Sequence, residues 1–261
     1  MVGAVQAYLI VVAGLFGLVF GSFATVVAHR VPRRESIGGR SACPSCGHVI
    51  TASENIPVLS YVLQRGRCRH CGHRIPARYP LVELTTGILF ALSAWRFGLS
   101  ATACVYAAFF WVLVVLSVID LEHRKLLNRI VYPSFVVGWV SLAAISVIQG
   151  NLDPLVGAGL GALIFGGFIF AVAFLYPAGM GGGDWKLAFV LGTFLGYLGA
   201  PGIVLLGMFL SFLVGSVGGI ATMLVRGGGR KSQVPFGPSL ALGTALAVFL
   251  GHPILDAYLR L

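Results

Sequence analysis

Charged residues are scarce in this chain of 261 residues. Only 10% of the residues are charged and eight are acidic, while 57% are apolar; a soluble domain carries about 25% charged residues. This composition excludes a water-soluble globular domain. The five cysteines are too few and too clustered for a disulfide scaffold, and the 36 glycines follow no collagen-like period. These features indicate a polytopic helical membrane protein.

Long uncharged runs predict eight transmembrane helices, most of them long enough to cross roughly 30 Å of hydrocarbon. The sixth run is the weakest, and the alternative is one long tilted helix with a re-entrant piece over 187–225. The first run lacks a preceding basic residue and a cleavage site, so we expect a retained helix and not a signal peptide. The predicted spans are 7–28, 81–97, 101–119, 130–149, 154–176, 187–200, 203–225 and 236–255.

Basic residues gather on one side of this predicted topology. Eight crossings place 29–80, 120–129, 177–186 and 226–235 on the same side, and these segments hold 16 of the 18 Lys and Arg residues. By the positive-inside rule this side is cytoplasmic and both termini are outside. The net charge of +10 therefore reflects membrane topology and attraction to the lipid bilayer, and it does not indicate nucleic acid binding.

The segment 29–80 contains two C-x-x-C-G motifs, with 21 residues between Cys46 and Cys68. Four thiolates at this spacing can close a tetrahedral zinc site, and the glycine after each pair allows a tight turn. Such a site has no open coordination position, so the predicted Zn²⁺ is structural and compensates for the small core of the loop. The predicted ligands are Cys43, Cys46, Cys68 and Cys71.

Three histidines beside the cysteine motifs and the fifth cysteine are not predicted to bind the metal. With four cysteines already present, His48, His70 and His73 are expected to be surface side chains. Cys104 lies in the third predicted span and is expected to be a small buried apolar residue.

Two acidic residues lie near membrane depth. Asp120 ends the third apolar run, and Asp184 follows the glycine-rich segment Gly179-Met180-Gly181-Gly182-Gly183. In the predicted topology both fall at cytoplasmic helix ends, so they can meet although they are 64 positions apart. Ionisable groups at such positions are functional by default. Two neighbouring carboxylates that share one proton are the arrangement that aspartic proteolysis requires, while a proton-coupled transporter is the alternative from another class.

The sequence resembles the type IV prepilin peptidases, which belong to the G-x-G-D membrane aspartic proteases. The resemblance covers nearly the whole chain. It is carried by Gly21-Ser22-Phe23, His29-Arg30-Val31-Pro32, the two cysteine motifs, Glu54-Asn55-Ile56-Pro57, Arg78-Tyr79-Pro80-Leu81-Val82-Glu83, Ile119-Asp120, Gly181-Gly182-Gly183-Asp184-Trp185-Lys186-Leu187 and Pro235-Phe236-Gly237-Pro238.

The resemblance implies a bifunctional enzyme of the bacterial cytoplasmic (inner) membrane. Such enzymes remove a short basic leader from type IV prepilins and type II secretion pseudopilins on the cytoplasmic side, after a Gly. They then methylate the new N-terminal amine with S-adenosylmethionine. The catalytic pair falls on Asp120 and Asp184, and the metal-binding cysteines fall on the four named above. A general intramembrane aspartic protease without methyltransferase activity is the alternative within the same chemistry.

The expected fold is an all-α polytopic membrane protein with about eight transmembrane helices and a small zinc-knuckle domain between the first two. The expected divisions are 1–28, the first helix; 29–80, the cytoplasmic zinc-binding loop associated with methyl transfer; and 81–261, the peptidase. Candidate residues for binding the methyl donor are Gly66, Glu54 and Glu83. One departure is visible: Leu126-Leu127-Asn128 stands where the family usually has Leu-Pro-Asp or Leu-Pro-Asn.

Overall fold

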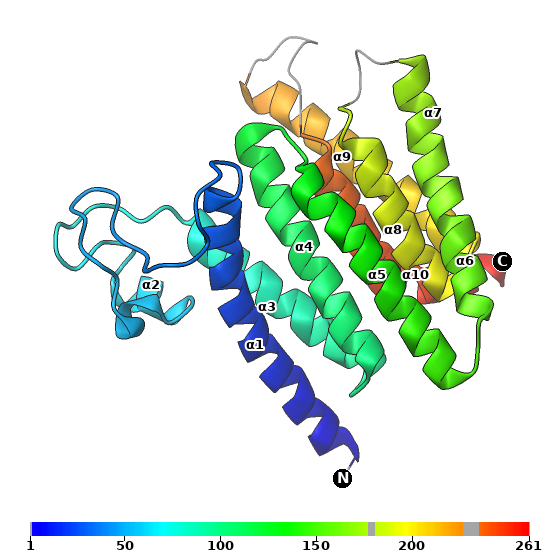
Figure 1. The fold of residues 1–261 in the computed structure, drawn as a ribbon, viewed down its shortest axis with the longest axis horizontal. Coiled ribbons are helices and arrows are strands. Elements are labelled where there is room, and N and C mark those ends of the chain that lie inside the picture. Colours follow the sequence, from blue (N-terminus) through cyan, green and yellow to red (C-terminus); the bar gives the residue numbers. More distant parts are fainter. Residues whose placement is uncertain (1, 177–180, 227–234, 261) are drawn as a thin grey trace. The chain divides into compact units, whose positions relative to one another are not determined.

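A computed structural model describes residues 2–176, 181–226 and 235–260 of the chain (Figure 1). These residues form helices and loops, and two isolated antiparallel bridges join Ala42 to Val49 and Arg67 to Arg74. The predicted all-α class is therefore confirmed. The chain divides into two compact units, Met1–Val115 and Leu116–Leu261.

The first unit is built on α1 (Val2–Arg30) and α3 (Arg78–Phe97), which pack along each other. Small residues allow the close approach. A Cβ on Gly21 would lie 2.6 Å from the Cα of Glu83, and a Cβ on Gly17 would lie 2.8 Å from the Cα of Gly87. The G-x-x-x-G pair of Gly17 and Gly21 thus serves internal helix packing.

A long loop connects these two helices. It contains a 3-10 turn, η1 (Ala52–Asn55), and a short helix, α2 (Leu59–Leu63). Figure 1 shows this loop, in blue to cyan, extending from the ends of α1 and α3 with little regular structure. The first unit is completed by the beginning of α4 (Ala101–His123).

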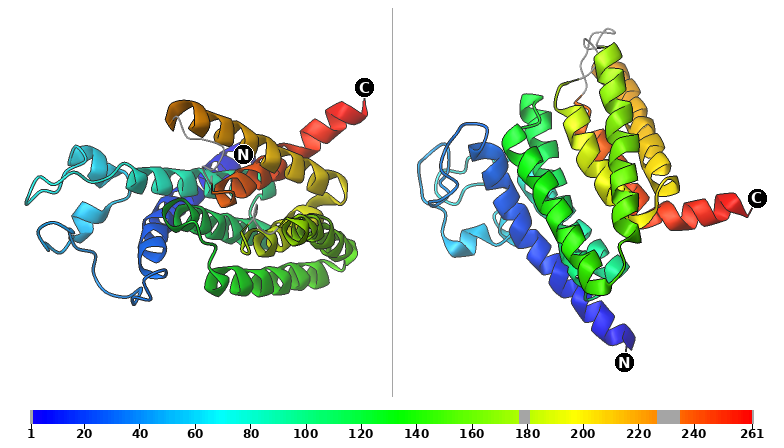
Figure 2. Two further views of the ribbon diagram at one scale, coloured as in Figure 1. Left: turned by 90° about the horizontal axis from the view of Figure 1, so that it is seen from above. Right: turned by 45° about the vertical axis from the view of Figure 1, so that its right-hand side comes forward.

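Among the described residues, the second unit contains the end of α4 and six further α-helices. α6, a π-helical turn η2 and α7 follow each other without a break and form one continuous path (Figure 2). The elements are α5 (Asn128–Gln149), α6 (Asp153–Gly161), η2 (Ala162–Gly166), α7 (Gly167–Leu175), α8 (Asp184–Gly199), α9 (Gly202–Arg226) and α10 (Gly237–Leu259).

Helix α8 is the core of the second unit. It packs against α5, α6, α9 and α10, and most of its side chains are buried. Its 16 residues span about 24 Å, which is shorter than the hydrocarbon layer. Glycines of α6 and α8 leave no room for a Cβ between the two backbones, with Gly157 and Gly161 facing Gly196 and Gly192. These pairs also serve internal packing.

Six described helical segments are long and apolar enough to cross a membrane, by length and composition: Gly3–Arg30, Ala101–His123, Asn128–Gln149, Asp153–Leu175, Gly202–Leu224 and Gly237–Leu259. Helices also occupy the other two predicted positions. However, α8 is short, and the apolar character of α3 is reduced by Glu83 and Arg96. The structure thus supports six candidate spans, and a topology of eight crossings stays a prediction.

The segment 187–225 forms two helices, since α8 ends at Gly199 and α9 begins at Gly202. The choice between two crossings and one long helix with a re-entrant piece stays a prediction, because only α9 of the two is a candidate span. The backbone of Ala200 between them is extended, with φ −94° and ψ 148°. Pro201 follows directly and explains the break, because the residue before a proline is disfavoured in the helical conformation.

Candidate functional site

Asp120 lies in the last turn of α4, and its side chain is buried. Its Oδ2 accepts a hydrogen bond of 2.9 Å from the backbone N–H of Gly237, the first residue of α10. The first N–H groups of a helix have no partner within the helix, and the helix dipole makes this end favourable for a negative charge. The N-terminus of α10 therefore holds the Asp120 carboxylate in place.

Gly237 also has a steric reason to be glycine. A Cβ on this residue would lie 2.7 Å from Oδ2 of Asp120, closer than real Cβ contacts come. Any side chain at this position must displace the carboxylate or the helix end. The backbone of Gly237 thus both bonds Asp120 and limits where it can lie.

Asp184 is the first residue of α8 and is also buried. Its Oδ2 accepts a hydrogen bond of 3.1 Å from the backbone N–H of Gly181, and its own N–H donates to the carbonyl of Gly181 at 3.1 Å. These two bonds form a tight turn that points the carboxylate back over the helix start. Gly179 and Met180, which belong to the same sequence motif, lie outside the described residues.

Leu126 connects the surroundings of the two aspartates. A Cβ on Gly183, directly before Asp184, would lie 2.6 Å from the Cβ of Leu126. A Cβ on Gly237 would lie 3.3 Å from Cδ2 of the same leucine. Leu126 therefore packs between the glycine that precedes one aspartate and the glycine that binds the other. The structure thus places the two predicted aspartates around one shared leucine.

Lys186 and Asn128 add a polar link beside this pair. Lys186 Nζ donates to Asn128 Oδ1 at 3.1 Å, and the ammonium group lies 5.4 Å from the centroid of the Tyr132 ring. The sequence alone predicted no role for either residue. Lys186 lies two positions after Asp184, and Asn128 belongs to Leu126-Leu127-Asn128, the motif in which the chain departs from the family pattern. Only their mutual contact across 58 positions reveals the link.

The replaced proline in that motif has a simple structural account. Leu127 is the N-cap residue of α5, and its backbone is extended, with φ −78° and ψ 119°. This φ lies within the range that proline adopts. The chain therefore passes from α4 to α5 with a φ at Leu127 that either residue permits.

The two cysteine motifs form a pair of matching knuckles in the first unit. In the first knuckle, the carbonyl of Cys43 accepts a hydrogen bond from the N–H of Gly47, and the N–H of Cys43 donates to the carbonyl of His48. The second knuckle repeats this pattern with Cys68, Gly72 and His73, and all four bonds are 2.9 Å long. The two glycines have φ of +71° and +69°, a conformation that favours glycine. The predicted turn role of both glycines is confirmed.

The four predicted thiol ligands converge. The Sγ atoms of Cys43, Cys46, Cys68 and Cys71 all lie within 4.8 Å of one another, and none forms a disulfide. Sγ of Cys43 is 3.8 Å from Sγ of Cys71. Zinc–sulfur bonds of about 2.3 Å in a tetrahedron place neighbouring sulfurs about 3.8 Å apart. The cluster therefore fits a zinc ion in its chemistry and its spacing.

The thiols of the first knuckle are unequal. Backbone N–H groups of Cys46 and Ser45 lower the pKa of Cys43 to about 6. The pKa of Cys46 is about 11, because the backbone N–H of His48 lowers it but burial and the neighbouring thiols raise it by more. Neighbouring thiolates repel one another, so without a cation the four thiols cannot all ionise easily. A bound metal ion removes this repulsion and keeps the thiols deprotonated.

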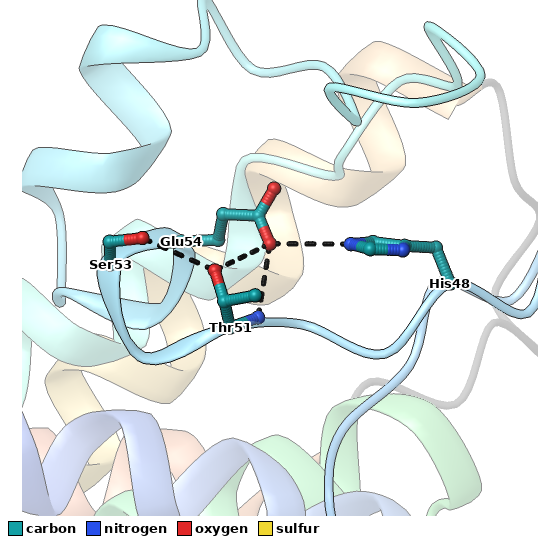
Figure 3. Close-up of polar contacts among 4 residues, drawn as sticks. All are labelled: His48, Thr51, Ser53 and Glu54. Carbon is teal, nitrogen blue, oxygen red and sulfur yellow. Dashed lines mark hydrogen bonds and ion pairs between the residues drawn. The ribbon is translucent and has the colours of Figure 1, made fainter.

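Glu54 belongs to a compact polar group next to the first knuckle (Figure 3). Its Oε2 accepts hydrogen bonds from the backbone N–H of Thr51 at 3.0 Å and from the Thr51 hydroxyl at 2.8 Å. The same oxygen lies 3.4 Å from Nε2 of His48. These contacts, first the Thr51 N–H and then its hydroxyl, lower the pKa of Glu54 to about 2.

The other two candidates for binding the methyl donor have separate local contacts. Glu83, in α3, accepts a hydrogen bond of 2.7 Å from the backbone N–H of Val58, the residue before α2. Gly66 has φ +65°, and Tyr61 fills the space that a side chain there would need. Within residues 2–176, no described hydrogen bond joins Gly66, Glu54 and Glu83.

Two plainer expectations about single residues are corrected. Cys104 is exposed in α4, because it lies on the outer surface of an apolar helix and not in the core. His48 is half-buried, and its ring stacks on that of His70 with the centroids 3.5 Å apart. His70 and His73 are exposed, as expected.

Fold and site together define a multi-span helical membrane protein with a buried aspartate pair and a four-cysteine loop. Residues 15–97 match the family described as Bacterial Peptidase A24 N-terminal domain, and residues 107–217 match the Type IV leader peptidase family. No solved structure matches the chain.

Several curated relatives share the full extent of the chain. It is 35% identical over 249 residues to the prepilin leader peptidase/N-methyltransferase of Bacillus subtilis, covering 95% of this chain and 96% of the relative. It is 35% identical to the protein of the same name from Pseudomonas aeruginosa and 37% identical to that from Aeromonas hydrophila, covering 94% of this chain and 92% of each relative. The chain belongs to the type IV prepilin leader peptidase family.

Proposed function

We propose that this protein is a membrane aspartic endopeptidase that removes the basic leader of prepilins or pseudopilins and then methylates the new N-terminus. Asp120 and Asp184 form the catalytic pair. The observation that supports this proposal is the meeting of two buried carboxylates, 64 positions apart, around Leu126 in a family whose relatives carry that activity in their names.

In the proposed reaction the two aspartates act as one unit that holds a single proton. The ionised carboxylate takes a proton from water while the resulting hydroxide adds to the carbonyl carbon of the scissile peptide. The protonated carboxyl hydrogen-bonds the carbonyl oxygen. As the C–N bond breaks, the leaving amine receives the proton. The N–H groups of Gly237 and Gly181 fix one oxygen of each carboxylate, so the other oxygens remain for water and substrate.

The proposed orientation puts this pair on the cytoplasmic side of a bacterial inner membrane. The support is the distribution of the 18 Lys and Arg residues, most of which fall on one side of an eight-crossing topology. The substrate's leader is expected to be basic, and the cytoplasmic segments are also basic. We therefore expect the apolar helix of the prepilin, and not its leader charge, to supply most of the binding.

The proposed role of the loop 29–80 is separate from cleavage. Cys43, Cys46, Cys68 and Cys71 hold a structural Zn²⁺, and this fixes the loop that the resemblance associates with methyl transfer. S-adenosylmethionine would supply the methyl group to the new amine. Gly66, Glu54 and Glu83 remain candidates for this second reaction, while their described contacts are structural.

The test is the rate of cleavage of a synthetic prepilin by the full-length protein in liposomes. Asp120→Asn and Asp184→Asn keep the size of each side chain but cannot share a proton, so each should abolish cleavage. Asp153→Asn is the matched control, because Asp153 is an exposed acidic residue at the start of α6. Full cleavage by either variant of the pair removes that residue from the mechanism. No cleavage even by the unaltered protein would favour a proton-coupled transporter.

A further inference from the structure

The short helix α2 of the loop exposes its apolar side chains and shields its polar ones. Leu59, Val62 and Leu63 are exposed by 50%, 62% and 66%, and residues at this spacing share one face of a helix. Ser60 and Tyr61, which carry the hydroxyl groups of this helix, are half-buried. This pattern is the reverse of the one expected for a helix whose outer face meets water.

A hydrogen bond fixes the beginning of α2 beside the helix pair α1 and α3. The N–H of Val58, the residue before α2, donates to Oε2 of Glu83 at 2.7 Å. Glu83 lies opposite Gly21 of α1, because a Cβ on Gly21 would lie 2.6 Å from the Cα of Glu83. The beginning of α2 therefore lies near the level of Gly21 and not beyond the end of α1.

Gly21 belongs to the part of α1 that can cross a membrane. The candidate span Gly3–Arg30 has 28 residues, which extend about 42 Å as a helix, while the hydrocarbon layer measures about 30 Å. A span centred in the bilayer and parallel to its normal therefore extends about 6 Å beyond the hydrocarbon at each end. Gly21 precedes Arg30 by about 13 Å of helix, so it lies about 7 Å inside this boundary.

This depth is the one at which interfacial helices lie. Such helices bury an apolar face about 5–10 Å into the boundary between lipid headgroups and acyl chains. The hydrogen bond from Val58 to Glu83 brings the exposed apolar face of α2 to this boundary. An exposed apolar face at this level therefore meets lipid.

The charge of the loop also suits a lipid surface. Residues 29–80 contain nine Arg and two Glu residues. Three exposed arginines follow α2 directly, at Arg65, Arg67 and Arg69. Arginine side chains can lie along apolar surface while their guanidinium groups reach phosphate headgroups, and anionic lipids attract basic segments near a membrane. An apolar protein helix would match only the apolar face of α2, whereas a lipid surface matches both this face and the arginines.

We propose that α2 anchors the loop in the membrane interface. Leu59, Val62 and Leu63 insert at the boundary between headgroups and acyl chains, and the arginines after α2 contact lipid phosphates. The loop is then held against the membrane by this face and by the hydrogen bond to Glu83. The proposal rests on the structure of the first unit and does not depend on the peptidase assignment.

The test is the fluorescence of tryptophan variants of the full-length protein in liposomes of phosphatidylcholine and phosphatidylglycerol. Leu59→Trp is compared with Ile37→Trp, because the two side chains are exposed by 50% and 51%. Ile37 lies in a turn at the end of α1, where Arg30 binds the carbonyls of Ser36 and Gly38. The signal of the four native tryptophans is subtracted with the unaltered protein.

Two quenchers report where each added tryptophan lies. Lipids brominated on the acyl chain near the headgroup quench a side chain at the boundary, and acrylamide quenches one in water. Leu59→Trp should lose most of its added fluorescence to the brominated lipid and little to acrylamide, and Ile37→Trp should show the opposite. Leu63→Trp, on the same face of α2, should behave as Leu59→Trp does.

Quenching of Leu59→Trp and Leu63→Trp by acrylamide, with none by the brominated lipid, would overturn the proposal, because α2 would then lie in water. Access of acrylamide to these variants that ends when a synthetic prepilin is added would also overturn it. The apolar face of α2 would in that case bind the substrate and not the membrane.

Discussion

The loop and the aspartate site place their reactive groups in opposite ways. In the loop, thiols and imidazoles come from short turns, several are exposed, and their positions follow from the two knuckles. At the aspartate site, both carboxylates are buried at helix ends, and backbone N–H groups of glycines hold them. We therefore expect the loop, which has little core, to depend on its ligand cluster, whereas packed helices can orient a carboxylate by a backbone group alone.

The two regions should therefore respond differently to mutation. Loss of one ligand should release the loop as a whole, because a structural metal supplies much of the folding free energy of a small domain. A change beside an aspartate should leave the helices packed and impair only the reaction, because the surrounding contacts are many and apolar.

Removal of the structural zinc should have the largest effect on structure. Cys43→Ser removes a buried ligand, and zinc binding contributes about 10–16 kcal/mol in isolated zinc-finger peptides. We expect the loop to become sensitive to proteases while cleavage of prepilin by the aspartate pair continues. Limited proteolysis and a cleavage assay measure the two properties side by side.

Cys104→Ser is the control for this prediction, because Cys104 lies in α4 and outside the cluster. It should leave zinc content and loop resistance unchanged. A loop that stays protease-resistant in Cys43→Ser would contradict the view that metal holds it together.

Gly237→Ala should have the largest effect on catalysis among changes outside the aspartates. The added Cβ would meet Oδ2 of Asp120 and displace the carboxylate. A misplacement of about 1 Å can cost about 100-fold in rate, so we expect kcat to fall by about that factor while KM changes little. Steady-state kinetics on a synthetic prepilin measure both values.

Gly218→Ala is the matched control, since a Cβ there meets nothing within 4 Å in α9. It should retain full activity. Equal activity of Gly237→Ala and the unaltered protein would show that the N-terminus of α10 does not position Asp120.

Glu83 should show a moderate and purely structural effect. Glu83→Ala leaves the partly buried N–H of Val58 without its acceptor, at a cost of about 1 kcal/mol. Glu83→Gln keeps an acceptor oxygen and should retain most of the stability. Thermal unfolding of both variants measures this difference. If Glu83→Gln is stable but does not methylate, the residue serves methyl transfer as well as structure.

Leu127→Pro should have the smallest effect, and a favourable one. The φ of −78° at Leu127 suits proline, and its N–H donates no backbone hydrogen bond among the described residues. Proline at a compatible position stabilises by about 0.4–1 kcal/mol through the unfolded state. Thermal unfolding and cleavage should show a slight gain in stability and unchanged activity. A marked loss of either would mean that the turn between α4 and α5 is not compatible with proline.

The sequence predicted the loop site well because its information is local. Each cysteine pair lies within four residues, and the glycine after it specifies the turn that the structure contains. The stacking of His48 on His70 escaped prediction, because it depends on how the two knuckles face each other. No pattern within one knuckle contains that relation.

The sequence predicted that both aspartates lie at helix ends, but it did not predict which groups hold them there. The N–H of Gly237 comes from a residue 117 positions after Asp120, and Leu126 meets glycines from two other segments. Such contacts follow from helix packing, which hydropathy does not specify. The same reason applies to the segment 187–225, where the sequence favoured a division at Ala200 and Pro201 and the structure places the break between α8 and α9 there.

The central claim is that cleavage and methylation belong to different regions of the chain. Its most direct test is the intact mass of two substrates, a full prepilin and a peptide already without its leader, after incubation with S-adenosylmethionine and the Asp184→Asn protein in liposomes. The account predicts that the full prepilin keeps its mass while the leaderless peptide gains one methyl group. A shortened prepilin, or a folded variant that fails to methylate the leaderless peptide, would contradict it.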